Sequence, residues 1–344
     1  MVDWRNLLLA YRRCRRRKRY RQPATEFDFA WEEHLLRLQH ELRAGEYCPG
    51  KYEQFHISDP KPRLISAAPF RDRVVHHAIV NVLEPLFERS FIADSYACRL
   101  GRGTHKAIQR AQQFQKRYGW CLKTDIVKFF PSVDHEVMLG VLRQKVADPQ
   151  LLSLLQLLLA SGEGVAGDDG GPVWFAGDDL LSVLRPRGLP IGNLTSQFFA
   201  NVLLNPVDHF IKETLRIPGY LRYADDLLLF SDDRRQLWEA VAALKERLGQ
   251  YRLRLHPRKT HVQPGSAWLT WLGMRIRGSR CRLSQQGIQR FVRRMRRQRR
   301  EYANGVIDAA RVRQSLHAWL GHVDVVTEAR VLGILMRQHC VFSK

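Results

Sequence analysis

One short stretch, Tyr220 to Phe230, constrains the fold more than any other part of the chain, and it reads YLRYADDLLLF. Two apolar runs of β-forming side chains flank Asp225 and Asp226, which predicts two strands with the acidic pair at the turn. Adjacent carboxylates between buried strands are costly unless a cation neutralises them, and a hard divalent metal is the commonest solution. We therefore interpret the pair as a metal site, with a solvated Asp-Asp turn as the alternative for this stretch alone.

The charge of the chain points to a polyanionic partner. Its 344 residues carry 56 Lys and Arg against 34 Asp and Glu, a net charge of +22, and 45% of them are hydrophobic, which allows a large core. Basic side chains cluster in residues 12–21 and 290–300. Nucleic acid is the first candidate, although an anionic membrane surface would attract the same patches. The first cluster favours an RNA contact over a solvated linker.

Other classes are excluded by what the sequence lacks. No apolar run approaches the length of a membrane span and the first residues contain no secretory h-region, so we expect a soluble, intracellular protein without a membrane partner. The six cysteines are scattered, with no Cys-x-x-Cys pair, which predicts reduced thiols rather than a zinc site or a disulfide framework.

Apolar periodicity predicts mixed helices and strands with no internal repeat. Helices are expected over residues 1–47, from His76, over 104–118, after Gln197, over 237–248 and from Ser284 onward. Strands or hairpins are expected over residues 52–65, 120–126, 220–230, 253–260 and 268–276. Segment 161–187 is expected to be an irregular insertion whose pairs Asp168-Asp169 and Asp178-Asp179 are solvated. Asp134 is expected to cap a helix, and Asp125, at a strand end, is a second candidate metal ligand.

From about residue 52 to 276, the order of these parts resembles a reverse transcriptase. The family has an Asp on a strand, a turn leading into a helix, a Tyr-x-Asp-Asp hairpin and a later Lys-Thr loop. Here they stand as Asp125, Gly188–Gln197, Tyr223–Asp226 and Lys259-Thr260. Four matches in the same order favour the metal-site interpretation.

The resemblance implies an α+β, right-hand polymerase fold with fingers, an antiparallel palm sheet carrying the Tyr-x-Asp-Asp hairpin, and a helical thumb. The expected division is a basic helical extension (1–50), fingers (51–118), palm (119–278, including the insertion 161–187), and thumb with a C-terminal tail (279–344).

Within this family the chain most resembles the reverse transcriptases of diversity-generating retroelements. Their hallmark, an aliphatic residue followed by Gly-x-x-x-Ser-Gln, stands here as Ile191 to Gln197. The runs 60–67, 94–104 and 319–322 also look like that group. The resemblance implies a cytoplasmic protein of a bacterium, phage or mobile element that copies structured RNA into cDNA with errors at template adenines. An antiphage-defence enzyme using a dedicated non-coding RNA or untemplated synthesis stays open, as does a non-catalytic RNA-binding scaffold.

The resemblance also implies the catalytic groups and partners. Asp125, Asp225 and Asp226 would hold two Mg²⁺ ions about 4 Å apart, with Mn²⁺ as a substitute. Lys259 would protonate the leaving pyrophosphate or contact a phosphate. The expected partners are an RNA template and primer, deoxynucleoside triphosphates, the cDNA product and a small, basic, oligomeric accessory protein.

The remaining candidates would contact the nucleotide or the nucleic acid. Phe130 is expected to be a steric gate against the sugar 2′ position, with a core aromatic as the alternative. Ile191 stands where most of the family has an amide, which predicts error-prone copying. The other nucleotide-binding candidates are Arg63, Arg71, Gly192, Gln197 and Tyr223, and the two arginines could bind phosphates as bidentate forks. The primer-grip and thumb candidates are Trp271, Leu272, Gly273, Arg290, Arg293, Arg294 and Arg297.

Overall fold

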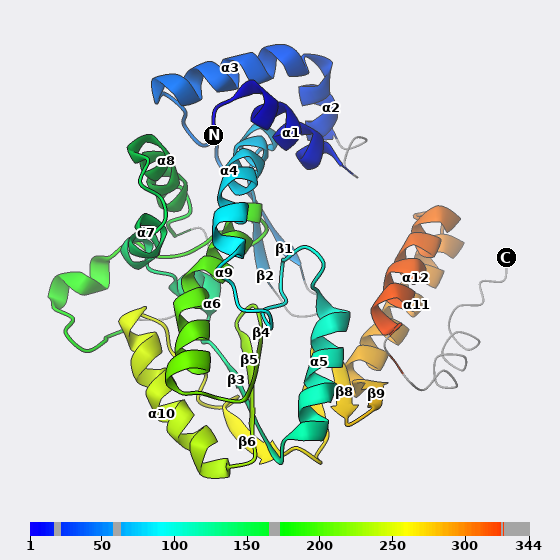
Figure 1. Cartoon of the computed structure of the whole chain (residues 1–344). Helices are drawn as coiled ribbons and strands as arrows, with labels where there is room; N and C mark the ends of the chain where they lie inside the picture. Colours follow the sequence, from blue (N-terminus) through cyan, green and yellow to red (C-terminus); the bar gives the residue numbers. More distant parts are fainter. Residues whose placement is uncertain (17–21, 58–62, 165–172, 325, 327–344) are drawn as a thin grey trace.

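The computed structural model describes residues 1–16, 22–57, 63–164, 173–324 and 326, and its centre is one antiparallel sheet (Figure 1). The strand order is β4-β5-β3-β6, so the β4–β5 hairpin pairs through β5 with the earlier strand β3, and β3 pairs on its other edge with the later strand β6. The bounds are β3 (Trp120–Asp125), β4 (Gly219–Tyr223), β5 (Asp226–Ser231) and β6 (His261–Pro264). Two smaller antiparallel sheets consist of β1 (Glu53–Ile57) with β2 (Arg63–Ala67), and of β7 (Leu269–Trp271), β8 (Met274–Arg277) and β9 (Arg280–Leu283).

Helices make up most of the remaining described structure. They are α1 (Trp4–Arg15), α2 (Gln22–Phe29), α3 (Trp31–Ala44), α4 (Phe70–Glu88), α5 (Thr104–Arg117), α6 (Phe129–Ser132), α7 (His135–Arg143), α8 (Pro149–Ala160), the 3₁₀ helix η1 (Leu180–Leu184), α9 (Leu194–His209), the π-helical η2 (Phe210–Thr214), α10 (Arg234–Gln250), α11 (Gln285–Ala303) and α12 (Ala309–Val323). As predicted, Asp134 caps α7 by accepting a hydrogen bond from the Val137 N–H at 2.9 Å.

Strand β5 is continuously apolar because both faces of the sheet are covered. Leu227 and Leu229 belong to a core cluster that includes residues of α10, whereas Leu228 and Phe230 belong to a second cluster that includes residues of α5. All four side chains are fully buried. The alternation follows the two-residue period of a strand, and covering both faces removes the polar half of the pattern.

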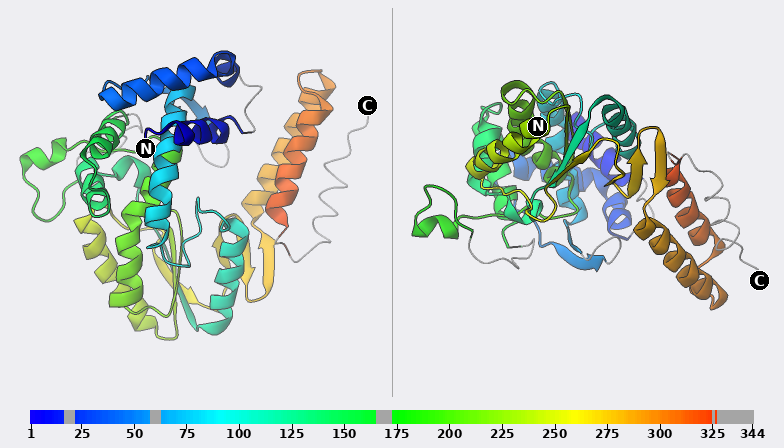
Figure 2. Two further views of the ribbon diagram at one scale, coloured as in Figure 1. Left: turned by 45° about the horizontal axis from the view of Figure 1, so that its top comes forward. Right: turned by 90° about the horizontal axis from the view of Figure 1, so that it is seen from below.

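The N-terminal helices pack on α4 (Figures 1 and 2). The ring of Tyr11 stacks on Trp31 with centroids 5.7 Å apart, and Phe27 lies 5.1 Å from Phe70 at the start of α4. Arg15, at the end of α1, pairs with Asp28 at 2.6 Å. Part of the basic cluster 12–21 is therefore anchored by an acid, and residues 17–21 lie outside the described residues.

Helices α11 and α12 lie side by side and project from the rest of the molecule, beyond the β7-β8-β9 sheet (Figure 2). The rings of Phe291 and Trp319 stack between them, with centroids 3.7 Å apart. The predicted apolar face of α11 is correct: Phe291 and Met295 are buried, and Ile288 and Val292 pack against the second cluster.

Several predicted boundaries are wrong. Residues 253–260 were expected to contain a strand, but the strand is β6, and Leu255 makes only an isolated bridge to Ile126. Strand β9 was not expected, because its basic residues hide the alternation of buried Cys281 and Leu283. Helix α4 begins at Phe70 rather than His76, which is buried inside it.

Of the acids of the insertion that the structure describes, Asp178 differs from expectation, whereas Asp179 is exposed as predicted. Asp178 is not solvated: Arg252 forms an ion pair with it, which lowers the pKa of its carboxyl group. Asp179 caps η1 through the Ser182 N–H. Asp168 and Asp169 lie outside the described residues. None of the helices in the described ranges has the length and apolar character needed to cross a membrane.

Candidate active site

Three carboxylates meet at one end of the central sheet. Asp125 is the last residue of β3, and its register partner is Asp226, the first residue of β5. Asp225 lies in the turn between β4 and β5, and its carbonyl accepts a hydrogen bond from the Ile126 N–H at 3.3 Å. The antiparallel pairing thus brings together two acids, Asp125 and Asp226, that are 101 positions apart in the sequence.

The electrostatics of this cluster suit a divalent cation. Burial, and then the charges of Asp125 and Asp226, raise the pKa of Asp225 to about 7. A cation would relieve this repulsion, and carboxylate oxygens are the hard ligands that Mg²⁺ prefers, so the donor set fits. In the described part of the chain, however, no three His, Cys, Asp or Glu side chains are gathered closely enough to hold an ion.

Lys259 provides the nearest cation. Its Nζ forms an ion pair with the Asp125 carboxylate. The loop that carries it is fixed to the end of β3: the His256 N–H donates to the Asp125 carbonyl at 2.7 Å, and the hydroxyls of Thr124 and Thr260 lie 2.7 Å apart. The Lys-Thr loop and Asp125 are therefore held as one unit.

An open cleft of about 770 Å³ lies beside the carboxylates. Ten of the residues singled out in the sequence line it: Arg63, Phe130, Ile191, Tyr223, Asp225, Asp226, Leu272, Gly273, Arg290 and Arg294. They come from β2, the α5-to-α9 region, the central hairpin, the β7–β8 turn and α11. The fold therefore gathers onto one surface residues that are scattered over most of the sequence.

The β2 side of the cleft is tied to the loop before α9. The Ser66 N–H donates to the Ile191 carbonyl at 2.9 Å. The Asn193 side chain donates to the Ser66 carbonyl at 3.0 Å and accepts from the Ala68 N–H at 3.2 Å. Gly192 has φ +117°, and a Cβ there would lie 2.9 Å from a methyl of Ile65. Gly192, which the sequence marked as a nucleotide-binding candidate, is thus required for a close approach to β2.

The two aromatic nucleotide-binding candidates, Phe130 and Tyr223, are held at the cleft by neighbouring rings. Phe130 is half-buried and packs edge-on against Phe129, with centroids 5.4 Å apart. The Tyr223 hydroxyl lies 3.0 Å from the Thr104 hydroxyl, and its ring meets Trp271 edge-on at 6.3 Å.

Other candidates are not at the cleft wall. Arg71 forms an ion pair with Glu41 of α3 and lies over the ring of Tyr47, so the structure does not bring it to the cleft. Gln197 is exposed on α9, as are Arg293 and Arg297 on α11. Trp271 is buried behind Leu272 and Gly273.

The sequence reasoning missed other cleft residues, among them Lys128 and His322. Burial, and then the charges of His105 and Arg290, lower the pKa of His322. Lys128, Ala224 and Leu272 are non-glycine residues with φ of +41°, +54° and +48°, and all three line the cleft. Residues with such strained backbone conformations are common at functional sites. Lys, Ala and Leu do not favour a positive φ, so the sequence gives no signal for these conformations.

Comparison with known proteins identifies the family of the chain. The family model described as "Reverse transcriptase (RNA-dependent DNA polymerase)" matches residues 57–276. Protein YkfC of Escherichia coli is 24% identical over 291 residues, which is 73% of either chain. The group II intron-encoded protein LtrA of Lactococcus lactis is 23% identical over 183 residues, 52% of this chain but only 28% of LtrA.

Among solved structures, the apo telomerase of Candida tropicalis overlaps 72% of this chain and 52% of its own, with 11% identity and a TM-score of 0.47. The family model covers well over half of the chain and spans the central hairpin, the Asp125 strand and the Lys-Thr loop. The chain therefore belongs to the reverse transcriptase family of RNA-dependent DNA polymerases.

Proposed function

We propose that this enzyme copies a structured RNA into cDNA, and that Asp125, Asp225 and Asp226 hold two Mg²⁺ ions for the transfer. The observation that carries the proposal is the meeting of three carboxylates at one end of the central sheet, where Asp225 and Asp226 line a cleft that arginines line from two sides. Acids facing a basic cleft suit a polyanionic substrate only if cations stand between them, as two-metal nucleotidyl transfer requires.

The metal ions would act as Lewis acids on the attacking hydroxyl and the leaving pyrophosphate. The chain's own groups have separate tasks. Arg63 would clamp the triphosphate and Phe130 would press against the sugar 2′ position, so that ribonucleotides are excluded. Lys259, released from Asp125, would donate a proton to the pyrophosphate or hold its charge. Arg290 and Arg294 would bind the backbone of the template–primer duplex.

We further propose that copying is error-prone at template adenines and serves a diversity-generating retroelement with a small basic accessory protein. The support is Ile191, which lines the cleft with an aliphatic side chain and is held against β2 by its own carbonyl. An aliphatic group offers the nascent base pair no hydrogen bond, so a mispair loses no partner at this position.

The test is primer extension on an RNA template with Mg²⁺, comparing wild type with Asp225→Asn and sequencing the products. Synthesis by the wild type should fall by a factor of about 10³ or more in the variant. No incorporation by the wild type, even with cognate RNA and accessory protein, would instead indicate an RNA-binding scaffold.

The error spectrum separates the remaining roles. Errors concentrated at template adenines, and reduced in Ile191→Gln, would support the retroelement role. Accurate copying would support a polymerase function and contradict the diversity-generating role. Untemplated or repetitive products would favour a role in antiphage defence.

A further inference from the structure

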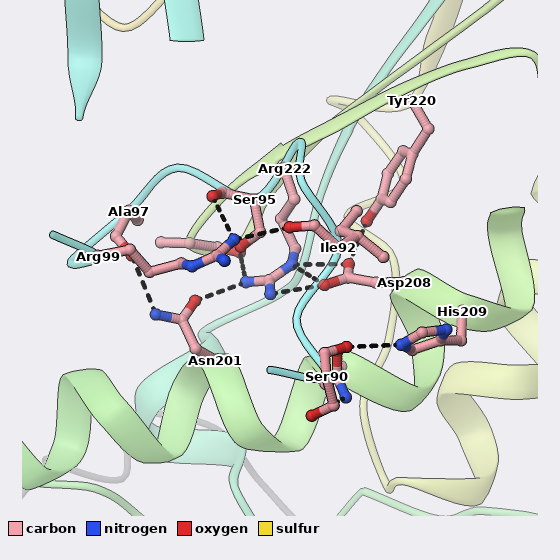
Figure 3. Close-up of polar contacts among 12 residues, drawn as sticks. Ser90, Ile92, Ser95, Ala97, Arg99, Asn201, Asp208, His209, Tyr220 and Arg222 are labelled. Atoms are coloured by element: carbon pink, nitrogen blue, oxygen red, sulfur yellow. Dashed lines mark hydrogen bonds and ion pairs between the residues drawn. The ribbon is translucent and has the colours of Figure 1, made fainter. Parts of the chain in front are cut away.

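Behind the central hairpin lies a buried ion pair that the proposed chemistry does not use (Figure 3). Arg222 on β4 and Asp208 on α9 are both fully buried. Two Arg222 nitrogens reach the carboxylate, Nε at 2.8 Å and Nη2 at 2.7 Å, and the Tyr220 hydroxyl donates to it at 2.6 Å. The carboxylate is thus saturated with donors.

This network is a poor device for stability alone. Removing two charges from water costs about as much as their attraction returns, so apolar side chains of similar volume would hold the two elements equally well. What an apolar pair could not do is donate hydrogen bonds in fixed directions. The informative contact is therefore the one made by the remaining guanidinium nitrogen.

Nη1 of Arg222 donates to the carbonyl of Ala224 at 3.2 Å and to the Asn201 side chain at 3.1 Å. Ala224 immediately precedes Asp225 and has φ +54°, a conformation that costs a residue with a Cβ roughly 1 kcal/mol or more. The guanidinium thus holds the carbonyl of the one strained residue in the turn that carries Asp225.

The main chain of Arg222 is held as well. Its N–H donates to the Asp94 carbonyl at 2.9 Å, and its carbonyl accepts from the Tyr96 N–H at 3.0 Å. The Asn201 side chain donates to the Ala97 carbonyl at 3.0 Å, so segment 94–97 and α9 close around the same arginine. The base of the turn is therefore fixed on both sides.

We propose that Arg222, oriented by Asp208, is a positioning residue that sets the Asp225 carboxylate for metal binding through the Ala224 carbonyl. The inference rests on the proposed function, because it concerns the ligand role of Asp225. Groups that orient a metal ligand typically change metal affinity about 10- to 100-fold when they are removed.

The test compares Arg222→Lys and the triple variant Arg222→Met, Asp208→Leu, Tyr220→Phe with the wild type. Lysine keeps the charge opposite Asp208 but lacks a second nitrogen to reach Ala224, and the triple variant leaves no buried charge unpaired. Arg252→Met is the matched control, since Arg252 also pairs with buried acid, through Asp134 and Asp178, without touching the hairpin turn.

Two readouts are needed: Mn²⁺ binding to the protein alone, by electron paramagnetic resonance, and the Mg²⁺ concentration for half-maximal primer extension. The dissociation constant for Mn²⁺ and the half-maximal Mg²⁺ concentration should each rise about tenfold or more in Arg222→Lys and in the triple variant, and by less than about twofold in Arg252→Met. The thermal midpoint of Arg222→Lys should stay near that of the wild type.

Wild-type Mn²⁺ binding in either folded variant would overturn the inference, as would failure of both variants to fold, because the network would then serve the fold. Failure of the proposed function looks different. In that case the wild type would bind no Mn²⁺, or Asp225→Asn would bind as much Mn²⁺ as the wild type.

Discussion

Asp225 follows a residue with φ +54°, and burial together with two neighbouring carboxylates raises its pKa to about 7. Both features oppose folding, since the backbone is strained and the ionised side chain is repelled by its surroundings. Neither would survive in a turn selected for stability. At the scale of the residue, the turn that carries Asp225 is therefore destabilising, and the surrounding fold must supply the free energy that offsets it.

Replacing Asp225 should consequently stabilise the metal-free protein. Asn keeps the shape and removes the charge, so in the presence of a chelator the thermal midpoint of Asp225→Asn is expected to rise by roughly 2–4 °C. Differential scanning calorimetry would check this. Asp233→Ala is a suitable control, because the Asp233 side chain caps α10 and its loss should lower the midpoint. An unchanged or lower midpoint for Asp225→Asn would contradict the prediction.

At the scale of the element, α11 presents two different basic faces. Arg290 and Arg294 line the cleft, whereas Arg293 and Arg297 are exposed away from its wall, and Arg297 lies 3.5 Å from Glu301. The sequence predicted one arginine-rich helix but did not show which arginines line the cleft, because that depends on which face of α11 packs against the rest of the molecule.

This division predicts unequal effects on duplex binding. In Arg290→Gln, Arg294→Gln the dependence of log affinity on log salt should lose about 2 units of slope, one for each phosphate contact. The matched double variant Arg293→Gln, Arg297→Gln has the same net charge and should lose less than about 1 unit. Fluorescence anisotropy with an RNA–DNA duplex at several salt concentrations measures both, and equal losses would contradict the assignment.

The junction of α9 and η2 contains a pH-dependent link. His209 bonds Glu213 through Nδ1 at 2.6 Å and the Ser90 carbonyl through Nε2 at 2.8 Å. The Glu213 hydrogen bond, and then the Ser90 carbonyl, raise the pKa of His209. Because the folded-state pKa is the higher one, this stabilisation is fully present below the pKa of the unfolded state and is lost as pH rises through the folded-state pKa.

Glu213→Gln should therefore lower the thermal midpoint at about pH 5.5 and leave it nearly unchanged at about pH 8.5. Thermal unfolding at the two pH values measures the difference. Glu246→Gln, on the neighbouring α10, is the control for a general change in surface charge, and a loss in Glu213→Gln that is equal at both pH values would count against a role for His209.

At the scale of the whole molecule, two hydrophobic clusters share one sheet. Successive residues of β5 alternate between the cluster with α10 and the cluster with α5. Neither cluster can lose its structure without exposing one face of the strands that carry the carboxylates. The site is thus coupled to both halves of the core.

This coupling predicts similar effects from opposite faces. Leu228→Ala and Leu229→Ala should each reduce the free energy of unfolding by about 2–5 kcal/mol. In both variants urea unfolding should remain one transition when it is followed by tryptophan fluorescence and by circular dichroism. Leu181→Ala, at a position 71% exposed on η1, is the control and should have little effect. Separate transitions in either core variant would show that the clusters unfold independently.

The order of the motifs and most of the elements could be predicted from the sequence, because apolar period and acidic turns are local signals. Asp125, Asp225 and Asp226 are an example, since their strand and hairpin are marked by neighbouring residues. Arg71 is the opposite case: its partner Glu41 lies in another helix, and no local pattern indicates the pairing. Likewise β6 is defined by its pairing with β3, far away in sequence, rather than by its own few residues. Strand β9 pairs with the adjacent β8, but its basic residues hide the alternation of its buried side chains.

The bonds between Asn193 and β2 have a mechanical consequence. Ile191 lies between β3 and β4 in sequence, but its carbonyl and the Asn193 side chain attach it to Ser66 and Ala68. The β1–β2 hairpin and Ile191, the residue proposed to govern copying accuracy, are therefore bonded to each other and would move together. A motion that closed the hairpin over a nucleotide would carry Ile191 with it, so under the proposed function the error rate would depend on that motion as well as on one side chain.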